Sequence, residues 1–218
     1  MRGDVILVEQ HHRVAAEEIA PAMLKAIASS DDKYTITVAG ESGSGKSETA
    51  TAIAEVLAAA GISSVILQQD DYFVYPPKSN DMARRKNISW VGPQEVKIEL
   101  LSSHMKAFLD GADHIEKPLV DYASDHIGEE VFAFGDAKVA ITEGTYTSLL
   151  ENVKTRIFIA RDFSQTLEHR RKRSRDSSEL DTFTEKVLEI EHGIISAHRL
   201  RADIVINADY SVNLNPND

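Results

Sequence analysis

A glycine-rich segment near the N-terminal end of the chain has the residue types that hold a nucleotide's phosphates. Residues 40–47 read GESGSGKS and satisfy the pattern GxxxxGK[ST]. Residues without a Cβ let the backbone curl so that successive N–H groups point at a phosphate. The lysine of such a loop reaches the β- and γ-phosphates, the serine hydroxyl ligates Mg²⁺, and the following helix N-terminus adds positive charge. The expected nucleotide-binding residues are Gly40, Ser42, Gly43, Ser44, Gly45, Lys46, Ser47 and Glu48, with Ser47 also expected at the metal.

Two adjacent carboxylates, Asp70 and Asp71, follow the next apolar run of the chain. A small-molecule kinase needs a carboxylate that takes the proton of the acceptor hydroxyl, at the end of a strand beside the phosphate loop. Asp70 is the candidate for this base and Asp71 is the alternative. Asp70 could instead have a purely structural role as the cap of a turn. The sequence has neither an NKxD-type guanine-reading segment nor an ABC signature loop, which points away from GTPases and ABC ATPases.

Short β-branched runs alternate with helical patterns along the chain, which predicts a mainly parallel sheet with helices on both faces. The expected strands are residues 34–40, 63–70, 137–144, 155–162 and 202–207. A helix is expected over residues 11–29, with Pro21 as a kink or restart. Two further core-facing helices are indicated by the stripe Ile53, Val56, Leu57 and Ala60, closed by a left-handed Gly61, and by the stripe Phe183, Val187, Ile190 and Ile194.

The bulk composition limits the partners that the protein can attract. The chain of 218 residues has 24 basic and 35 acidic side chains, a formal charge of −11, so long-range attraction to nucleic acid or an anionic membrane is disfavoured. It has no cysteine, which excludes disulfides and thiolate metal sites and suits a reducing cytosol. Residues 1–12 fit neither a signal-peptide core nor a membrane span. We expect a cytoplasmic protein with neither nucleic acid nor a membrane as a partner.

One long polar insert and a short tail complete the organisation. We expect one domain over residues 1–218, with residues 71–135 forming an insert that carries function, since long inserts usually do. Strand pieces are indicated at residues 116–122 and 129–134 within this insert, and residues 211–218 are expected to fray.

Five motifs occur in an order and spacing that resemble the uridine kinase and phosphoribulokinase family. They are QDDYF (69–73), SWVGPQEV (89–96), KPLVDYASDH (117–126), AITEGTY (140–146) and RRKRSRDSSEL (170–180). The resemblance covers residues 34–207. It implies a three-layer α/β P-loop NTPase fold with an acceptor-binding insert, ATP and Mg²⁺ as cofactors, a small-molecule alcohol as acceptor, and a homo-oligomer.

The resemblance also implies residue roles. Asp70 matches the family's general base, Glu143 the acid that holds the Mg²⁺ hydration shell, and Lys46 the lysine at the phosphates. Arg171 and Arg175 match the arginines of a lid at about residues 163–182, although a nucleic-acid patch or a solvated helix face remain other interpretations of this basic run. The alternative for Glu143 is a residue at a strand end without a metal role. The alternative for Trp90 is a position in the core instead of a place at the acceptor. The residues expected at the acceptor are Asp71, Tyr72, Phe73, Arg84, Arg85, Trp90, Asp121 and Tyr122.

The departures from the family pattern concern the acceptor. Val91 stands where uridine kinases carry the aspartate that binds the ribose, and Val120 and Asp125 stand where they carry the residues that read the pyrimidine. Leu180 also replaces part of the lid motif. The resemblance implies a nucleoside acceptor such as uridine or cytidine. Because an arginine pair can grip a phosphate, Arg84 and Arg85 make a phosphorylated sugar the alternative. A non-catalytic nucleotide-binding regulator is the alternative from another class.

Overall fold

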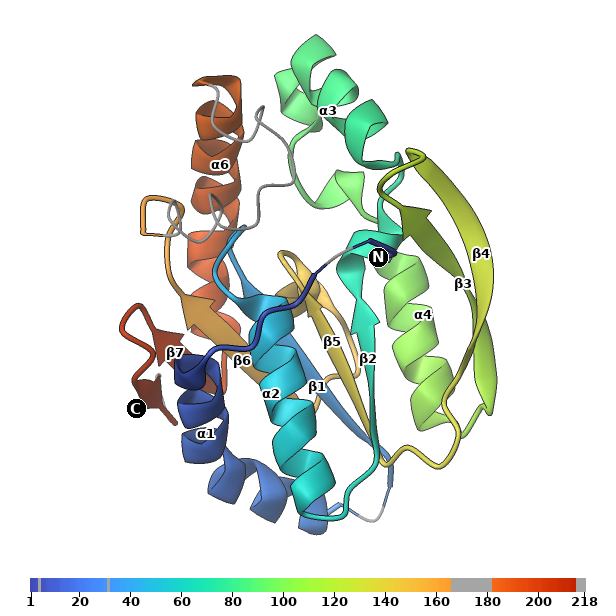
Figure 1. The fold of residues 1–218 in the computed structure, drawn as a ribbon, viewed down its shortest axis with the longest axis vertical. Helices are drawn as coiled ribbons and strands as arrows, with labels where there is room; N and C mark the ends of the chain where they lie inside the picture. The colour runs from blue at the N-terminus through green and yellow to red at the C-terminus, as the bar shows by residue number, and fades with distance from the viewer. Residues whose placement is uncertain (4, 31, 166–181, 215–218) are drawn as a thin grey trace.

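The protein is an α/β structure built on a central, mainly parallel sheet (Figure 1). The structure is a computed structural model, and it describes residues 1–3, 5–30, 32–165 and 182–214. The six strands lie in the order β2-β5-β1-β6-β7-β8, and only β8 runs antiparallel to its neighbour. Their bounds are β1 Tyr34–Gly40, β2 Ser64–Gln68, β5 Val139–Gly144, β6 Thr155–Ala160, β7 Ile204–Asn207 and β8 Val212–Asn213.

The five parallel strands are the five predicted ones, and the predicted fold class is confirmed. The sixth strand was not predicted: Val212 and Asn213 pair with β7, so the expectation of a frayed tail is wrong for these two residues. Every residue of β1 and of β5 is buried. Strands covered on both faces in this way are continuously apolar and β-branched, which explains why their sequence signal was strong.

Helices cover both faces of the sheet and form two separate cores. Helices α1 (Gln10–Ala28) and α2 (Lys46–Ala59) cover one face, with strand side chains such as Ile36 and Ile141 between them and the sheet. Helix α4 (Ile98–Leu109) and the helical segments near the C-terminal end cover the other face, against side chains such as Leu67 and Val205. The predicted three layers are therefore present.

The predicted helices form, with one shift of face. Pro21 lies inside α1, and Gly61 follows α2 with a φ of 74° in the left-handed region, as expected. The late helix, α6, spans Thr182–Ile195, but its buried residues are Val187, Leu188, Glu191 and Ile195. Of the predicted stripe only Val187 is fully buried, so the core-facing side of α6 lies about one residue away from the prediction.

The insert between β2 and β5 folds beside the carboxyl ends of the strands. Its elements are the short helix η1 (Gln69–Tyr72), α3 (Pro77–Lys86), η2 (Ile88–Trp90), η3 (Pro93–Glu95), α4, and the hairpin β3 (His114–Asp121) with β4 (His126–Ala133). The hairpin agrees with the two predicted strand pieces. Residues 1–3 lie beside this hairpin, where Arg2 bridges to Asp121, and residues 5–9 run across the front of α2 to α1 (Figure 1). The segments η4 (Thr147–Leu149) and η6 (Ser196–Arg201) complete the fold.

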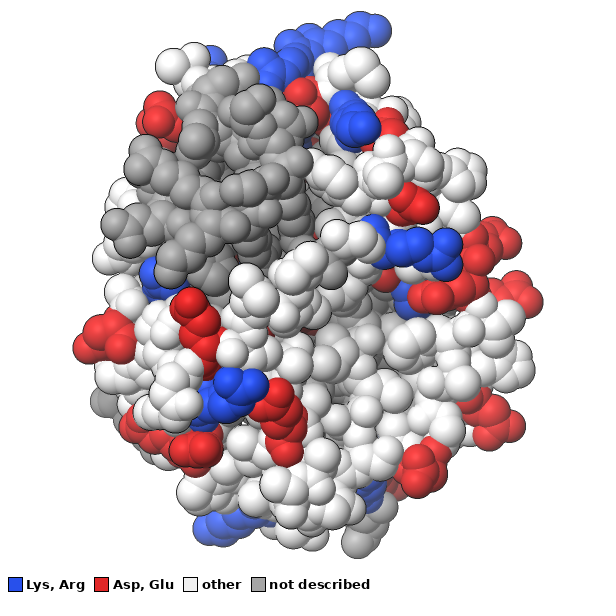
Figure 2. All heavy atoms as spheres, viewed as in Figure 1, with Lys and Arg blue, Asp and Glu red and all other residues white. Residues whose placement is uncertain are grey.

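The surface and the helices add two observations on partners. Acidic and basic side chains are interspersed over the face shown in Figure 2, without an extended basic area among the described residues. Within the described part of the chain, no helix combines the length and apolarity that crossing a membrane requires.

Candidate active site

The glycine loop adopts a phosphate-binding conformation at the start of α2. Gly43 and Gly45 have φ values of 76° and 95°, a region that side chains with a Cβ rarely adopt. The Lys46 amine folds back over the loop and donates to the Glu41 carbonyl oxygen at 2.9 Å. The Ser44 hydroxyl is buried and has no hydrogen-bond partner among the described residues. Because the first N–H groups of a helix also lack intrahelical partners, the residues present fit an anionic phosphate chain.

Ser47 and Glu143 form a hydroxyl–carboxylate pair beside this loop. Ser47 Oγ donates to Glu143 Oε1 at 3.1 Å, joining the first turn of α2 to the end of β5. Burial, followed by the nearby negative charge of Asp70, raises the pKa of Glu143 to about 7, and Lys46 and Ser47 oppose this rise. A buried carboxylate next to a hydroxyl suits Mg²⁺, which is held in such enzymes by few protein oxygens together with water and substrate phosphates. No group of three or more His, Cys, Asp or Glu residues with metal-binding geometry occurs within the described residues.

The two neighbouring acids at the end of β2 have different surroundings. Asp71 is 3% exposed and is held on both oxygens, by Lys117 Nζ at 2.7 Å and by the Val120 N–H at 3.1 Å. Asp70 instead lines a cavity of about 210 Å³ that lies beside the glycine loop. Of the two, Asp70 has the accessible carboxylate.

This cavity, called the acceptor cavity below, collects residues from segments far apart in the chain. It is lined by Met1, Ser42, Asp70, Phe73, Pro77, Asn80, Arg84, Tyr122, Thr145 and Glu191. Four of the residues predicted at the acceptor or its base are therefore brought together, namely Asp70, Phe73, Arg84 and Tyr122. Ser42, predicted at the nucleotide, also lies here, whereas Glu48 is buried in the first turn of α2.

The other residues predicted at the acceptor have different contacts. Tyr72 is fully buried and its hydroxyl is 2.8 Å from His104 Nδ1 of α4. Asp121 accepts from the N–H groups of Ala123 and Ser124 in the hairpin turn. Trp90 donates to Asn80 Oδ1 at 2.9 Å and packs against Tyr75, one layer behind the cavity.

The two arginines of the insert diverge. Arg84 faces the acceptor cavity and is paired with two carboxylates, those of Glu95 and Glu191. Arg85 pairs with Asp81 at 2.7 Å and lies over the Phe183 ring, 4.5 Å from its centroid. The predicted arginine pair therefore does not converge on one ligand.

The base of the predicted lid is tied to the glycine loop through Glu41. The Glu41 carboxylate accepts from the Phe163 N–H at 2.7 Å and contacts His192 Nδ1 of α6 at 2.6 Å. These contacts join Phe163, at the start of the lid region, and His192, in the helix that follows it, to the glycine loop. Arg171 and Arg175, predicted as lid arginines, lie outside the described residues.

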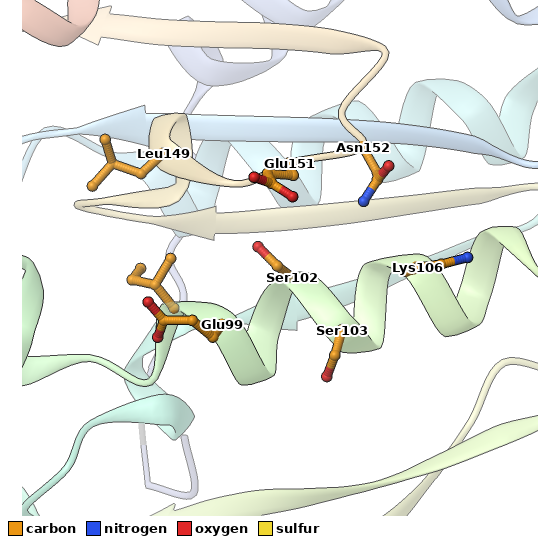
Figure 3. A pocket seen from close by; sticks show the side chains of 8 residues that line it. Glu99, Ser102, Ser103, Lys106, Leu149, Glu151 and Asn152 are labelled. Carbon is orange, nitrogen blue, oxygen red and sulfur yellow. The ribbon is translucent and has the colours of Figure 1, made fainter.

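A larger cavity of about 380 Å³ lies between α4 and residues 149–152, at and after the end of η4 (Figure 3). Glu99, Ser102 and Lys106 of α4 line one side of it, and Leu149, Glu151 and Asn152 line the other. None of its lining residues comes from the glycine loop or the ends of β2 and β5. Despite its size, it has no group placed for phosphoryl transfer.

Comparison with known proteins adds to this geometry. Residues 35–194 match the model of the family described as "Phosphoribulokinase / Uridine kinase family". The chain belongs to this family. Because the family and its structural relatives are kinases, the chain is an ATP-dependent kinase with an alcohol group as acceptor.

Individual members of the family differ in their acceptors. Uridine kinase of Mycoplasma pneumoniae is 30% identical over 187 residues, covering 81% of this chain and 86% of that protein. The bifunctional α-galactosidase/sucrose kinase AgaSK of Mediterraneibacter gnavus is 26% identical over 194 residues, covering 84% of this chain but only 21% of that longer protein. The phosphoribulokinase of Rhodobacter spheroides superposes with a TM-score of 0.61 at 11% identity, covering 82% of this chain and 71% of the other, and this similarity concerns the fold.

The three positions that depart from uridine kinases have structural contacts here. Val91 and Val120 are 4% and 0% exposed. Asp125 accepts from the N–H groups of Lys78 and Ser79, at 2.7 and 3.2 Å, and so caps the first turn of α3 from the hairpin. None of the three lines the acceptor cavity.

Sequence reasoning missed four polar residues of the site, Asn80, Glu95, Thr145 and Glu191. Glu191 had a detectable signal, because it is a charge within an apolar helical stripe. Glu95 is isolated between turn residues and carried no signal of its own. Asn80 lies in α3 among charged residues, where an amide is unremarkable.

Proposed function

We propose that this kinase transfers the γ-phosphoryl group of ATP to a hydroxyl of a small metabolite, with Asp70 as the general base. The observation that carries the proposal is the position of the Asp70 carboxylate, in a cavity that also contains glycine-loop and insert residues. The pairing of the neighbouring Asp71 with the buried Lys117 supports Asp70 rather than Asp71 as the base.

In the proposed reaction, a bond forms between the acceptor oxygen and the γ-phosphorus, and the bond to the ADP leaving oxygen breaks. Asp70 accepts the hydroxyl proton as the new bond forms. Lys46, the loop N–H groups and the start of α2 hold the phosphates and offset their charge. Ser47 and Glu143 would hold Mg²⁺, which supplies charge neutralisation at the phosphates when bound. Arg171 and Arg175 are proposed to cover the transferring group.

The family resemblance implies a nucleoside such as uridine or cytidine as acceptor, and a phosphorylated sugar is the alternative. The burial of Val91 and Val120 and the capping bonds of Asp125 weaken the case for a pyrimidine-reading pocket. The separation of Arg84 from Arg85 weakens the case for a phosphate grip. A third candidate, a free sugar, is favoured by the similarity to a sucrose kinase.

The test is alcohol-dependent ADP formation from Mg-ATP, measured for the wild-type protein and for Asp70→Asn. The variant keeps the size of the side chain but cannot accept a proton, so turnover should fall by about 10²- to 10⁴-fold. ATP affinity should be unchanged, because Asp70 is not part of the glycine loop. Unchanged turnover would contradict Asp70 as the base, and ATP binding without any alcohol-dependent turnover would favour the non-catalytic regulator.

A further inference from the structure

The acceptor cavity contains an ion bridge that joins two of its walls. Arg84, from α3 of the insert, donates through Nη2 to Glu95 Oε2 at 2.9 Å and to Glu191 Oε1 of α6 at 3.0 Å, and its Nε also contacts Glu95. Glu191 is 107 residues away from Arg84 in sequence. The bridge therefore ties the insert to the helix that follows the lid region.

The charge of Arg84 is already balanced. Its side chain is 19% exposed, against 0% for Glu95 and 8% for Glu191, so the bridge is largely screened from water. Burial alone would lower the pKa of Arg84, but Glu191 and Glu95 raise it above its ordinary value. A guanidinium held by two carboxylates has little net positive charge left for a ligand.

Among the described residues that line the cavity, Arg84 is the only lysine or arginine, and the Met1 ammonium group is paired with Asp71 at 3.2 Å. Asp70 and Glu191 are both acidic. A phosphorylated acceptor would add negative charge next to both carboxylates. A phosphate bound at Arg84 Nη1 alone would meet a guanidinium whose charge the two carboxylates already balance, and one that displaced Glu95 from Arg84 would leave Glu95 fully buried without its main partner. Breaking a buried pair in this way should lower the affinity for a phosphorylated acceptor by roughly a hundred-fold or more.

The groups that remain suit uncharged hydroxyl groups. Arg84 Nη1 has N–H donors that the bridge does not use, Glu191 has a second carboxylate oxygen, and Thr145 contributes a hydroxyl. Phe73 and Tyr122 add aromatic surface to the same cavity. Donors and acceptors in alternation beside an aromatic ring recognise the hydroxyl groups and the apolar C–H face of a sugar.

We propose that the Arg84–Glu95–Glu191 bridge makes the acceptor cavity selective for an uncharged polyhydroxylated acceptor and excludes phosphorylated ones. The shared chemistry is a set of vicinal hydroxyls, supplied by a free sugar or polyol or by the ribose of a nucleoside. This inference rests on the proposed kinase function and names the class of its acceptor.

The experiment compares matched pairs of acceptors that differ by one phosphate. ADP formation from Mg-ATP is measured with fructose and fructose 6-phosphate, ribulose and ribulose 5-phosphate, sucrose and sucrose 6-phosphate, and uridine and UMP. In each pair that supports turnover, we expect kcat/KM to be at least 100-fold higher for the unphosphorylated member than for the phosphorylated one. The sugar pairs and the nucleoside pair distinguish the two sources of the hydroxyls.

A variant tests whether the bridge is the cause. Glu191→Gln keeps the hydrogen bond to Arg84 but removes one negative charge, so the preference for the unphosphorylated member should fall by about tenfold. Glu99→Gln is the matched control, because Glu99 lines the separate cavity of Figure 3, and it should leave the preference unchanged. The wild-type comparison stands even if Glu191→Gln does not fold.

The outcomes separate this inference from the proposed function. Higher kcat/KM for a phosphorylated member, or an unchanged preference in folded Glu191→Gln, would overturn the inference and leave the kinase function intact. Absence of turnover with every compound would overturn the proposed function and the inference together.

Discussion

Asp70 and Asp71 are adjacent in sequence, but only Asp71 is held by a buried cation. Lys117 Nζ, itself 3% exposed, lies 2.7 Å from Asp71 and also 2.7 Å from Glu130 on the neighbouring strand. Asp70 lines the acceptor cavity. Within the short helix η1, Asp71 therefore contacts the insert, whereas Asp70 lines the cavity.

Substitution of Asp71 should therefore lower stability, whereas substitution of Asp70 should lower turnover. Asp71→Asn should destabilise the fold by about 3 kcal/mol, because it leaves Lys117 buried with only Glu130 as its charge partner. Asp70→Asn should leave the unfolding free energy within about 0.5 kcal/mol of wild type while removing turnover. Urea titration and steady-state kinetics on both variants measure the two effects. Similar stability of both variants would contradict the assignment.

The contact between Gly144 and Gln69 fixes the spacing between the end of β5, which carries Glu143, and the start of η1, which carries Asp70. A Cβ on Gly144 would lie 2.2 Å from the Gln69 Cβ, and φ at Gly144 is 156°. Gly144→Ala should therefore separate β2 from β5 locally, with a loss of stability of about 2 to 4 kcal/mol and a lower kcat.

Gly61→Ala is the control for this prediction. Gly61 has a φ of 74° but nothing within 4 Å of an added Cβ. It should show only the backbone strain, of about 1 kcal/mol, with kcat unchanged. If the two variants lost equal stability and retained equal kcat, the close approach at Gly144 would not be the determining contact.

The five parallel strands and the glycine loop could be predicted because their signals are local. A doubly covered strand is apolar along its length, and a phosphate loop needs glycines at fixed spacing. The long-range contacts of the insert and of the acceptor cavity could not be predicted in the same way. Asp125, with a φ of 49°, caps a helix 46 residues earlier, and Glu191 pairs with Arg84 across 107 residues. Nothing local in the sequence encodes such partners.

The pH dependence of stability should carry a contribution from Glu143. Its pKa is raised from 4.5 to about 7, so the folded protein holds this proton more tightly than the unfolded chain. The contribution is fully present below about pH 4.5 and is lost as the pH rises through about 7. A shift of this size corresponds to roughly 3 kcal/mol at most.

Glu143→Gln removes this titration and provides the comparison. Thermal unfolding of both proteins in EDTA, from pH 5 to pH 8, should show wild type losing stability relative to the variant as the pH rises. Parallel curves would show that Glu143 does not titrate in this range. Added Mg²⁺ should stabilise wild type more than the variant at pH 8, because the ionised carboxylate is the form that binds a cation.

The Glu41 contacts should matter for the nucleotide more than for the acceptor. Glu41→Ala removes the acceptor of the Phe163 N–H and the partner of His192, so the start of the lid region and the helix that follows it lose their contacts with the glycine loop. We expect KM for ATP to rise by about five- to fiftyfold, with a smaller change in KM for the acceptor. Lys106→Ala, at an exposed pair with Asp110, is a control that should change neither constant. Equal effects on both KM values would contradict a role specific to the nucleotide side.

The most direct test of Asp70 as the base is transfer of labelled γ-phosphate from ATP to an alcohol, by wild type and by Asp70→Asn at equal ATP occupancy. We expect a labelled phosphate ester with wild type and at least a hundred-fold less with the variant. Equal labelling by the two proteins, or no labelled ester from wild type with any sugar or nucleoside, would contradict it.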